Sequence, residues 1–463
     1  MQEESHSSDK GEAGLMKFSR AIMSGYTYLP RAEINVDRYI KALTAKNKYE
    51  PEKVVEMFDN SQKDWFGVPR YFLAGASASI VEDKRSEGRP IHITSTTRLW
   101  GYQQKALDEF NKKIKEKFTG IFLEADPGAG KTIMGIKMIC DLNKTALIVV
   151  PKKDLVEQWK ARLLSNTTIR EEDIGVCSNG KCDWREKKIV IGVVHTLAKD
   201  REGETFRSKF GTILFDECDS SVPPKTFAPV AAMFSAKYRI GMTASATRAD
   251  LLHIVFENHI KEAHIKCSNT NTMIPKGYMV QYGKSSGYIS PKSKGIPRRG
   301  MLISHLASNQ DRNEKLAEYV LWAFKEGHHT LVISDRKEQL MELEKILYDF
   351  GINKGVIGYY CASMDGKIFK KKELDAVAKN CRIILGTYGM IGRGTDIQRL
   401  SCLVLASPRS DMRQIKGRIE RFLAGKKEPV IIDFVDTAYK DCISAARQRI
   451  DCYSEKNMKV YQI

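Results

Sequence analysis

Two series of short, nearly uninterrupted apolar runs constrain the fold of this chain more than any other feature. The first series lies between residues 120 and 242 and reads GIFL, ALIVV, KIVIGVV, TILF and YRIGM. The second lies between residues 330 and 435 and reads TLVIS, GVIGYY, RIILGT, CLVLA and PVIIDFV. Strands that are apolar on both faces are typical of parallel sheets covered by helices. The sequence therefore predicts two consecutive α/β domains.

The length of 463 residues allows about three domains, at roughly 150 residues each. We expect a flexible tail over residues 1–16, a small α+β accessory domain over 17–95, and two α/β domains over 96–267 and 268–463. The polar N-terminus lacks the apolar core of a secretory signal. The apolar runs are also far shorter than the roughly 20 residues of a membrane span, so we expect no transmembrane helix.

The ten cysteines are spread singly along the chain, as expected of buried, reduced thiols. Cys177 and Cys182 lie close enough to suggest a metal site. A tetrahedral zinc site needs two further ligands, and no matching pair follows. We therefore expect a plain loop at this position.

The formal net charge of +18 indicates a polyanionic partner, because a basic surface binds nucleic acid through counterion release. The alternative is that the lysines only keep the protein soluble. The segment between Glu262 and Asp311 contains no acidic residue. It is either a solvated linker or a loop that touches nucleic acid, in which case its tyrosines could stack on bases. These tyrosines are Tyr278, Tyr282 and Tyr288. In the accessory domain, DWFGVPRYFL is either an aromatic core segment or a direct DNA contact.

A glycine-rich loop, ADPGAGKT over residues 125–132, follows an apolar run and opens an amphipathic helix. This is the setting of a phosphate-binding loop, in which backbone N–H groups and the helix N-terminus face the phosphates. Lys131 can reach the β and γ phosphates, and the Thr132 hydroxyl can bind magnesium. The loop therefore predicts a site for ATP and Mg²⁺, with Ala125 where such loops usually begin with glycine. Its candidate nucleotide-binding residues are Gly128, Ala129, Gly130, Lys131 and Thr132.

An acidic pair, Asp216 and Glu217, ends the apolar run TILF. Ligands of open parallel sheets bind at the carboxyl ends of the strands, so Asp216 can hold Mg²⁺ beside the phosphate loop. Glu217 can then orient or deprotonate an attacking water. Two acidic residues that merely cap a strand are the alternative, which the upstream phosphate loop makes much less favourable.

These residues are similar to those of superfamily 2 helicases of the DExH type, and further motifs of that family follow in order. The sequence LWGYQQKAL resembles the adenine-reading Q motif, with Gln103 as the base contact. ALIVVPKKDLVEQW and VVHTL resemble motifs Ia and Ib, which line the nucleic-acid track. GMTASAT, over residues 241–247, resembles motif III, which couples hydrolysis to domain movement. TLVISDR and GTYGMIGRGTDI resemble motifs IV and V.

The last motif, QIKGRIER, resembles motif VI. On a helix, Arg418 and Arg421 would share one face at a spacing of three residues, and both could act on the γ phosphate. Gln414 would bond to Asp219, which stands where the family usually has histidine. The resemblance also implies nucleotide or motif III contact for Asp396. The residues that it implies for nucleic-acid contact are Pro151, Lys152, Thr196, Ser334, Arg336 and Thr387.

The resemblance implies two tandem RecA-like parallel-sheet domains that hold ATP and magnesium between them while nucleic acid crosses both. The DECD box and Gln414 disfavour the DEAD-box RNA group, and the chain is most similar to the UvsW-like branch-migration helicases of tailed phages, with XPB-like translocases as relatives. The implied function is ATP-dependent remodelling of branched DNA in replication, recombination and repair, in a bacterial or phage-infected cytoplasm. The alternatives are an RNA helicase, the motor of a restriction system, or a nucleic-acid binding module with a silent ATPase fold.

Overall fold

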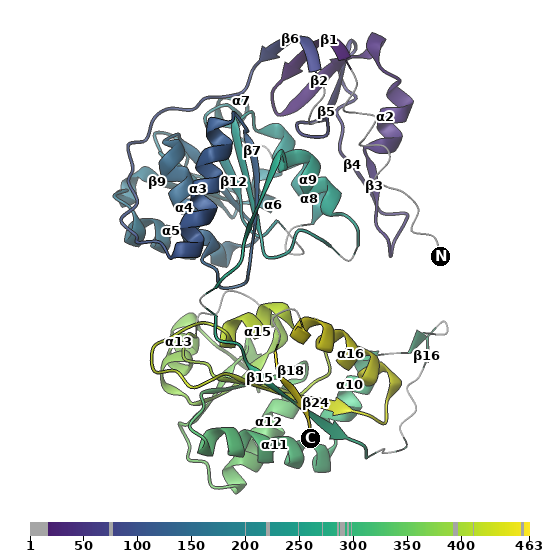
Figure 1. Cartoon of the computed structure of the whole chain (residues 1–463), viewed down its shortest axis with the longest axis vertical. Helices are drawn as coiled ribbons and strands as arrows, with labels where there is room; N and C mark the ends of the chain where they lie inside the picture. Colours follow the sequence, from purple (N-terminus) through teal and green to yellow (C-terminus); the bar gives the residue numbers. More distant parts are fainter. Residues whose placement is uncertain are drawn as a thin grey trace. The chain divides into compact units, whose positions relative to one another are not determined.

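The chain folds into two compact units, Met1–Asn269 and Thr270–Ile463, which we call unit 1 and unit 2 (Figure 1). The expected tail over residues 1–16 lies outside the described residues. Within the described part, no helix is both long and apolar enough to cross a bilayer. The computed structural model describes residues 17–73, 77–199, 201–218, 223–248, 250–270, 272–284, 287, 292–293, 296–297, 299–391, 397–410, 412–454 and 458–463.

Unit 1 begins with a small β domain. Its sheet has the strand order β5-β2-β1-β6, and α2 and the β3–β4 hairpin accompany it. Phe66 and Val68 of β5 are fully buried, so this part of DWFGVPRYFL is a core segment. The elements are β1 (Lys17–Met23), β2 (Tyr26–Pro30), η1 (Arg31–Glu33), α2 (Val36–Ala42), β3 (Thr44–Lys46), β4 (Val54–Glu56), β5 (Trp65–Pro69) and β6 (Ser77–Asp83).

The rest of unit 1, as far as it is described, is an eight-stranded sheet with helices on both faces. Its order is β10-β9-β11-β8-β12-β13-β7-β14, parallel except for β10. The strands are β7 (Gly120–Ala125), β8 (Ala146–Val150), β9 (Ile174–Ser178), β10 (Lys181–Cys182), β11 (Ile189–Val193), β12 (Thr212–Phe215), β13 (Tyr238–Thr243) and β14 (Ala263–Cys267). The helices are α3 (Gly101–Lys115), α4 (Lys131–Leu142), α5 (Lys153–Asn166), η2 (Glu171–Asp173), α6 (Val194–Leu197), α7 (Glu204–Arg207), α8 (Pro224–Met233) and α9 (His253–Ile260).

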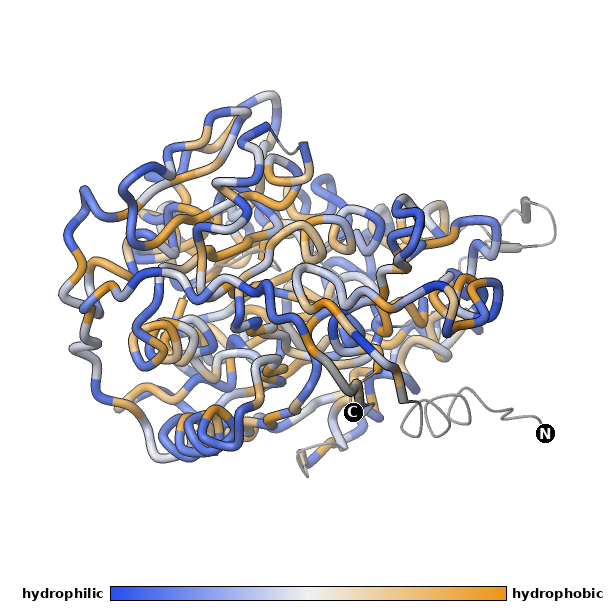
Figure 2. The backbone as a smooth tube through the Cα atoms, turned by 90° about the horizontal axis from the view of Figure 1, so that it is seen from above, coloured by the Kyte–Doolittle hydropathy of each residue, from blue (hydrophilic) through white to orange (hydrophobic). Residues whose placement is uncertain are grey.

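Alternate side chains of these strands enter two separate cores. Ile121 and Leu123 of β7 pack with α3, α4 and α5, whereas Phe122 packs with α8 and α9 on the opposite face. This alternation is the two-residue period of a β-strand, and it explains why the runs are apolar at every position. Most of the helices bury one face and expose the other, and their coils change between orange and blue in Figure 2.

The small β domain and the large sheet share one of these cores. Phe66 of the small domain belongs to the same apolar cluster as Phe122 and Phe227 of the large-sheet region. Two buried arginines join the parts further by donating to backbone carbonyls. Arg70 donates to Ala236 O (2.6 Å) and to Ser24 O, and Arg239 donates to Gly25 O (2.7 Å) and His259 O (2.9 Å). Burial lowers the pKa of the Arg239 guanidinium well below its usual value.

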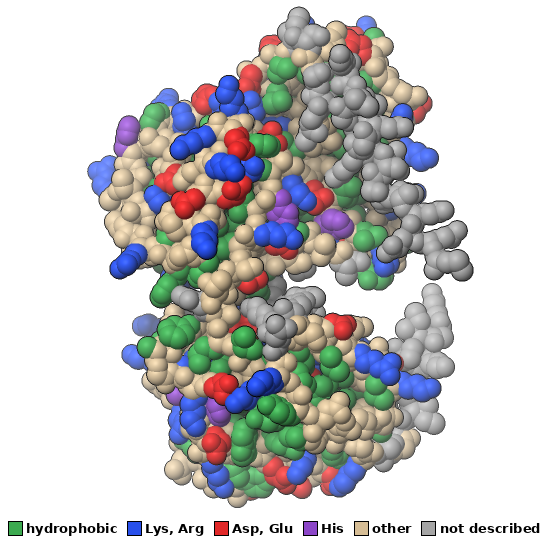
Figure 3. Space-filling view, in the orientation of Figure 1, with side chains coloured by type: hydrophobic (Ala, Val, Ile, Leu, Met, Phe, Trp, Pro, Cys, Tyr) green, Lys and Arg blue, Asp and Glu red, His purple; other side chains and the backbone are tan. Residues whose placement is uncertain are grey.

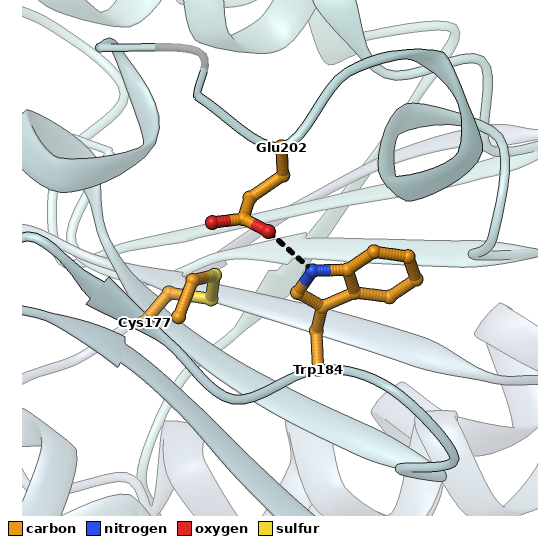
Figure 4. The surroundings of a disulfide bond; sticks show 4 residues. Cys177, Trp184 and Glu202 are labelled. Carbon is orange, nitrogen blue, oxygen red and sulfur yellow. Dashed lines mark hydrogen bonds between the residues drawn. A yellow bond between two sulfur atoms is a disulfide. The ribbon is translucent and has the colours of Figure 1, made fainter.

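The cysteine pair near the outer edge of this sheet corrects our expectation of a plain loop. Cys177 and Cys182 are paired residues of the β9–β10 hairpin and form a disulfide. Figure 4 shows its surroundings, where Trp184 Nε1 donates to Glu202 Oε2 at 2.6 Å. The other eight cysteines are all buried. Spacing alone indicated closeness, but it could not reveal that a hairpin aligns the two side chains.

Unit 2, where described, contains a seven-stranded parallel sheet of order β19-β22-β18-β23-β24-β15-β25. Its strands are β15 (Lys276–Tyr282), β18 (Thr330–Ser334), β19 (Ile357–Tyr360), β22 (Ile383–Thr387), β23 (Cys402–Leu405), β24 (Val430–Asp436) and β25 (Val460–Gln462), and the short pairs are β16 (Lys292–Ser293) with β17 (Ile296–Pro297) and β20 (Ser363–Met364) with β21 (Lys367–Ile368). Its helices are α10 (Arg299–Ala307), α11 (Gln310–Lys325), α12 (Lys337–Asp349), α13 (Lys371–Asn380), α14 (Tyr388–Ile391), α15 (Arg413–Ile419) and α16 (Lys440–Ser454).

The predicted fold class is confirmed: two parallel-sheet α/β regions follow a small N-terminal domain. Part of the acid-free segment is regular structure, because it contains β14, β15 and α10. Tyr282 is buried and Tyr278 stacks on Tyr461, so these two rings are part of unit 2 and its sheet. Tyr288 lies outside the described residues.

The arginine clamp predicts that Arg70→Ala lowers the free energy of unfolding of unit 1 by about 3 kcal/mol, because buried carbonyls lose their donor. Arg20→Ala is the matched control, since Arg20 forms an exposed pair with Glu82 and such pairs contribute at most about 1 kcal/mol. Urea unfolding followed by circular dichroism measures both. Equal effects of the two substitutions would contradict the clamp.

Candidate nucleotide-binding site

The strand order of unit 1 brings three predicted motifs together at one sheet edge. β13 pairs in parallel with β12 on one side and with β7 on the other. The carboxyl ends of β7 and β12 are therefore two strand spacings apart, or about 10 Å. The phosphate loop follows β7, the acidic pair follows β12, and the motif III segment follows β13 between them.

The phosphate loop has the backbone that its glycines predict. Gly128 and Gly130 both have φ of 81°, in the left-handed region that favours glycine. Gly130 is the N-cap of α4, whose first backbone N–H groups have no partner within the helix and so face the loop. A Cβ atom on Gly130 would lie 2.4 Å from Gln103 Nε2, so any other residue here would displace the Gln103 amide.

Gln103 is buried beside this loop and contacts it directly. Its Nε2 donates to Ala129 O at 2.8 Å, and its Oε1 accepts from Trp100 N–H at 3.0 Å. The side chain therefore links the start of α3 to the phosphate loop. The adenine contact expected of Gln103 stays a prediction.

Lys131 and Asp126 complete the loop. The Lys131 ammonium donates to Ala125 O (2.9 Å) and Asp126 O (3.3 Å), so it lies over the loop where phosphates would be held. Asp126 N–H donates to Cys267 O (3.2 Å), and Asn269 N–H donates to Asp126 Oδ2 (3.0 Å). The loop is thus bonded to the segment by which the chain leaves unit 1.

The acidic pair has a fixed geometry. Asp216 is buried, with 7% of its surface exposed, and its Oδ2 accepts from Trp159 Nε1 at 2.7 Å. Its Oδ1 accepts from Glu217 N–H at 3.0 Å. Glu217 itself has φ of 52°, an uncommon backbone conformation for a residue with a side chain, of the kind that gathers at functional sites.

The motif III segment is bonded to both neighbours. Cys218 N–H donates to Met242 O (3.0 Å), which joins the acidic box to β13. Ala246 N–H donates to Glu124 Oε1 (3.1 Å), which joins the motif III segment to β7. Thr243 Oγ1 closes the turn by donating to Ser245 O. The three motifs therefore form one hydrogen-bonded cluster.

The residues of unit 1 expected to contact nucleic acid follow the adjoining strands β8 and β11. Lys152 is exposed, Thr196 is half-buried, and Pro151 is buried. On the face shown in Figure 3, basic and acidic side chains of unit 1 are interspersed. The contacts of these residues with nucleic acid stay predictions.

In unit 2, Ser334 is wholly buried, and its expected contact with nucleic acid stays a prediction. Its hydroxyl accepts from Arg336 N–H (3.0 Å) and donates to Gln339 Oε1 (2.7 Å), so it shapes the turn that carries Arg336. The Arg336 guanidinium donates to Ser304 Oγ (2.9 Å) and Gly300 O (2.7 Å). Thr387 ends β22 and is half-buried.

We predicted that Arg418 and Arg421 share one face of a helix. This prediction is wrong for Arg421, because α15 ends at Ile419. Arg421 instead forms an antiparallel bridge with Thr272. Lys426 caps the C-terminal end of this helix, because its Nζ donates to the carbonyls of Ile419 (2.6 Å) and Arg421 (2.7 Å). Asp219, Asp396 and the side chain of Gln414 lie outside the described residues.

Comparison with known proteins supports the resemblance to helicases. A family described as "Type III restriction enzyme, res subunit" matches residues 96–248. The chain is 27% identical over 382 residues to a candidate ATP-dependent RNA helicase of Acanthamoeba polyphaga mimivirus, covering 81% of this chain and 71% of that protein. It is 23% identical to a candidate helicase of Escherichia phage T5, covering 68% and 67%.

Two solved structures are also similar. The Pyrococcus furiosus Hef helicase domain matches with a TM-score of 0.51 and 16% identity, covering 75% of this chain and 97% of that one. The crystal structure of T4 UvsW matches with a TM-score of 0.36 and 14% identity, covering 96% and 98%. The chain contains a helicase domain, and its homologues are superfamily 2 helicases. Such a domain implies an ATP-hydrolysing enzyme that binds nucleic acid.

The residues of the candidate site fit a magnesium nucleotide. The glycine loop and the N-terminus of α4 suit phosphates, and Lys131 supplies a positive charge beside them. The Thr132 hydroxyl and the Asp216 carboxylate are hard oxygen donors of the kind that Mg²⁺ prefers. When bound, the metal would neutralise charge on the phosphate oxygens.

Two side chains with contacts at the predicted motifs were not predicted from the sequence. Trp159 belongs to the quoted motif Ia sequence, but nothing in that sequence indicates a bond from its indole to Asp216. Lys426 follows motif VI in a loop that reads as a solvated turn, although its ammonium holds the segment that carries Arg421. The Trp159 contact joins residues far apart in the sequence, and the Lys426 contact closes a turn. Neither kind of contact can be predicted from hydrophobic periodicity.

The surroundings of Lys426 lower its pKa to about 8, first through burial and then through the charge of Arg421. The ordinary lysine pKa is about 10.4. The folded state thus favours the neutral amine, and this group makes unfolding less favourable as pH rises from about 8 to about 10.4.

We predict that competitive acetylation with acetic anhydride, read by mass spectrometry between pH 7 and 11, gives Lys426 an apparent pKa near 8. Lys315 is the control, because its hydrogen bond to Glu318 raises its pKa. If Lys426 titrates together with Lys315, the burial of its ammonium is contradicted.

Proposed function

We propose that this helicase is an ATP-dependent translocase that remodels branched DNA, such as forks and four-way junctions, in replication, recombination and repair. The proposal is carried by the hydrogen-bonded cluster of the phosphate loop, the acidic pair and the motif III segment. In such a cluster, loss of the γ phosphate from the bound nucleotide shifts the hydrogen bonds that hold the loop after β13. The family couples hydrolysis to movement along nucleic acid in this way.

The roles that we propose follow from the chemistry of each group. Lys131 binds the β and γ phosphates, and Thr132 and Asp216 hold Mg²⁺. Glu217 orients the attacking water and accepts its proton. Arg418 and Arg421 stabilise the charge that develops on the γ phosphate.

Several observations support DNA as the track. The DECD box and Gln414 differ from the DEAD-box RNA group. The net charge of +18 suits a nucleic acid of either kind. The small β domain shares a core with the motor, which suits a protein that grips more than a single strand. RNA is the second candidate, because the mimivirus relative is named as an RNA helicase.

The test is the ATPase rate at fixed salt with single-stranded, duplex, forked and four-way-junction DNA, with matched RNA, and without nucleic acid. We expect the strongest stimulation with branched DNA, followed by branch migration in a junction assay. An ATPase rate stimulated by RNA alone would contradict a DNA substrate and indicate an RNA helicase. The absence of turnover with every substrate would contradict an active motor.

Lys131→Ala should reduce ATP turnover by at least about 100-fold, because the charge that faces the phosphates is lost. DNA affinity should stay within about threefold, since backbone binding uses other residues. Lys137→Ala is the control on the same helix, because Lys137 only forms a surface pair with Asp141. A parallel loss of turnover and DNA affinity in Lys131→Ala would count against separate sites.

A further inference from the structure

The buried contact between Trp159 and Asp216 carries an inference that rests on the proposed ATPase function. Trp159 lies in α5, and 1% of its surface is exposed. Its Nε1 donates to Asp216 Oδ2 at 2.7 Å, and both residues are buried. We propose that Trp159 is a positioning residue that holds the Asp216 carboxylate in the orientation in which it binds Mg²⁺.

The contact fixes the carboxylate from both sides. Asp216 Oδ2 accepts from the indole, and Oδ1 accepts from the backbone N–H of Glu217 at 3.0 Å. Because each oxygen accepts at least one hydrogen bond, rotation of the carboxylate breaks at least one of them. An ionised carboxylate has about four acceptor positions, so a donor on each oxygen is compatible with a bound metal or its water.

An indole suits this task because it is a donor without a charge. A lysine or arginine in its place would orient Asp216 equally well but would neutralise the charge that attracts Mg²⁺. Partners of metal-binding carboxylates commonly set their orientation, and their loss costs about 10–100-fold in metal affinity or activity.

The packing of α5 holds the indole itself. Trp159, Val156 and Leu163 lie in the apolar core between the helices and the sheet, the core that also contains Met134 of α4. α5 packs on α4, the helix that begins with Lys131. The same helix starts directly after Lys152, about 10 Å along its axis from Trp159. α5 thus joins a predicted nucleic-acid contact to the metal-binding carboxylate.

The competing explanation is that the ring only fills the core and that its N–H has found an acceptor. Trp159→Phe separates the two explanations, because it keeps an aromatic ring and removes the donor. Trp184→Phe is the matched control. Trp184 is also buried and donates to a carboxylate, Glu202 Oε2, at 2.6 Å, near the disulfide in Figure 4.

The experiment measures ATPγS binding to the full chain by calorimetry, in EDTA and at increasing Mg²⁺. In Trp159→Phe, the Mg²⁺ concentration at half-maximal enhancement should rise about 10–100-fold. The affinity for ATPγS in EDTA should be unchanged, because the phosphate loop is intact. Trp184→Phe should match the wild type in both measurements. An unchanged Mg²⁺ requirement in Trp159→Phe overturns the positioning role.

A measurement on the wild-type protein guards against misfolding of the variant. In protein labelled with ¹⁵N-tryptophan, the indole signal that moves in Asp216→Ala identifies Trp159. That signal should shift when Mg²⁺ is added to the wild type saturated with ATPγS, and its constancy would overturn the inference. Failure of the wild type to bind ATPγS, with or without Mg²⁺, would instead contradict the proposed function.

Discussion

The parallel pairing of β13 with both β12 and β7 is the constraint on which the site depends. The carboxyl ends of these three parallel strands lie at the same edge of the sheet. The loops that follow the strands are therefore neighbours because of the strand order alone. Hydrogen bonds from Cys218 to Met242 and from Ala246 to Glu124 then join the loops. The chemistry of the protein is therefore built on rigid strands, and only short turns are left to position the reacting groups.

The small β domain is joined to the large sheet by a shared apolar core as well as by hydrogen bonds. Its aromatic core continues into the core on one face of the large sheet. Arg239, which holds Gly25 of the small domain, lies on β13 four residues before Thr243 of the motif III segment. One strand thus touches the accessory domain at one end and the candidate site at the other.

The sequence predicted the features that depend on a repeated pattern or on the conformational preference of a single residue type. Continuous apolar runs revealed the strands because both faces of the sheet are covered, and the glycines of the phosphate loop revealed a backbone that few other residues adopt. Other features depend on tertiary contacts. The end of α15 before Arg421 is set by Lys426 and Thr272, the burial of Ser334 by the turn around it, and the Trp159 bond by the packing of α5. No pattern of spacing encodes such pairs.

The bonds of Asp126 have a mechanical consequence. Through Cys267 and Asn269, the phosphate loop is fastened to the last residues of unit 1, and the covalent chain continues from there into unit 2. A rearrangement of the loop must either break these bonds or displace the origin of the connecting peptide. The connecting peptide is thus a covalent tether between the phosphate loop of unit 1 and the first residues of unit 2.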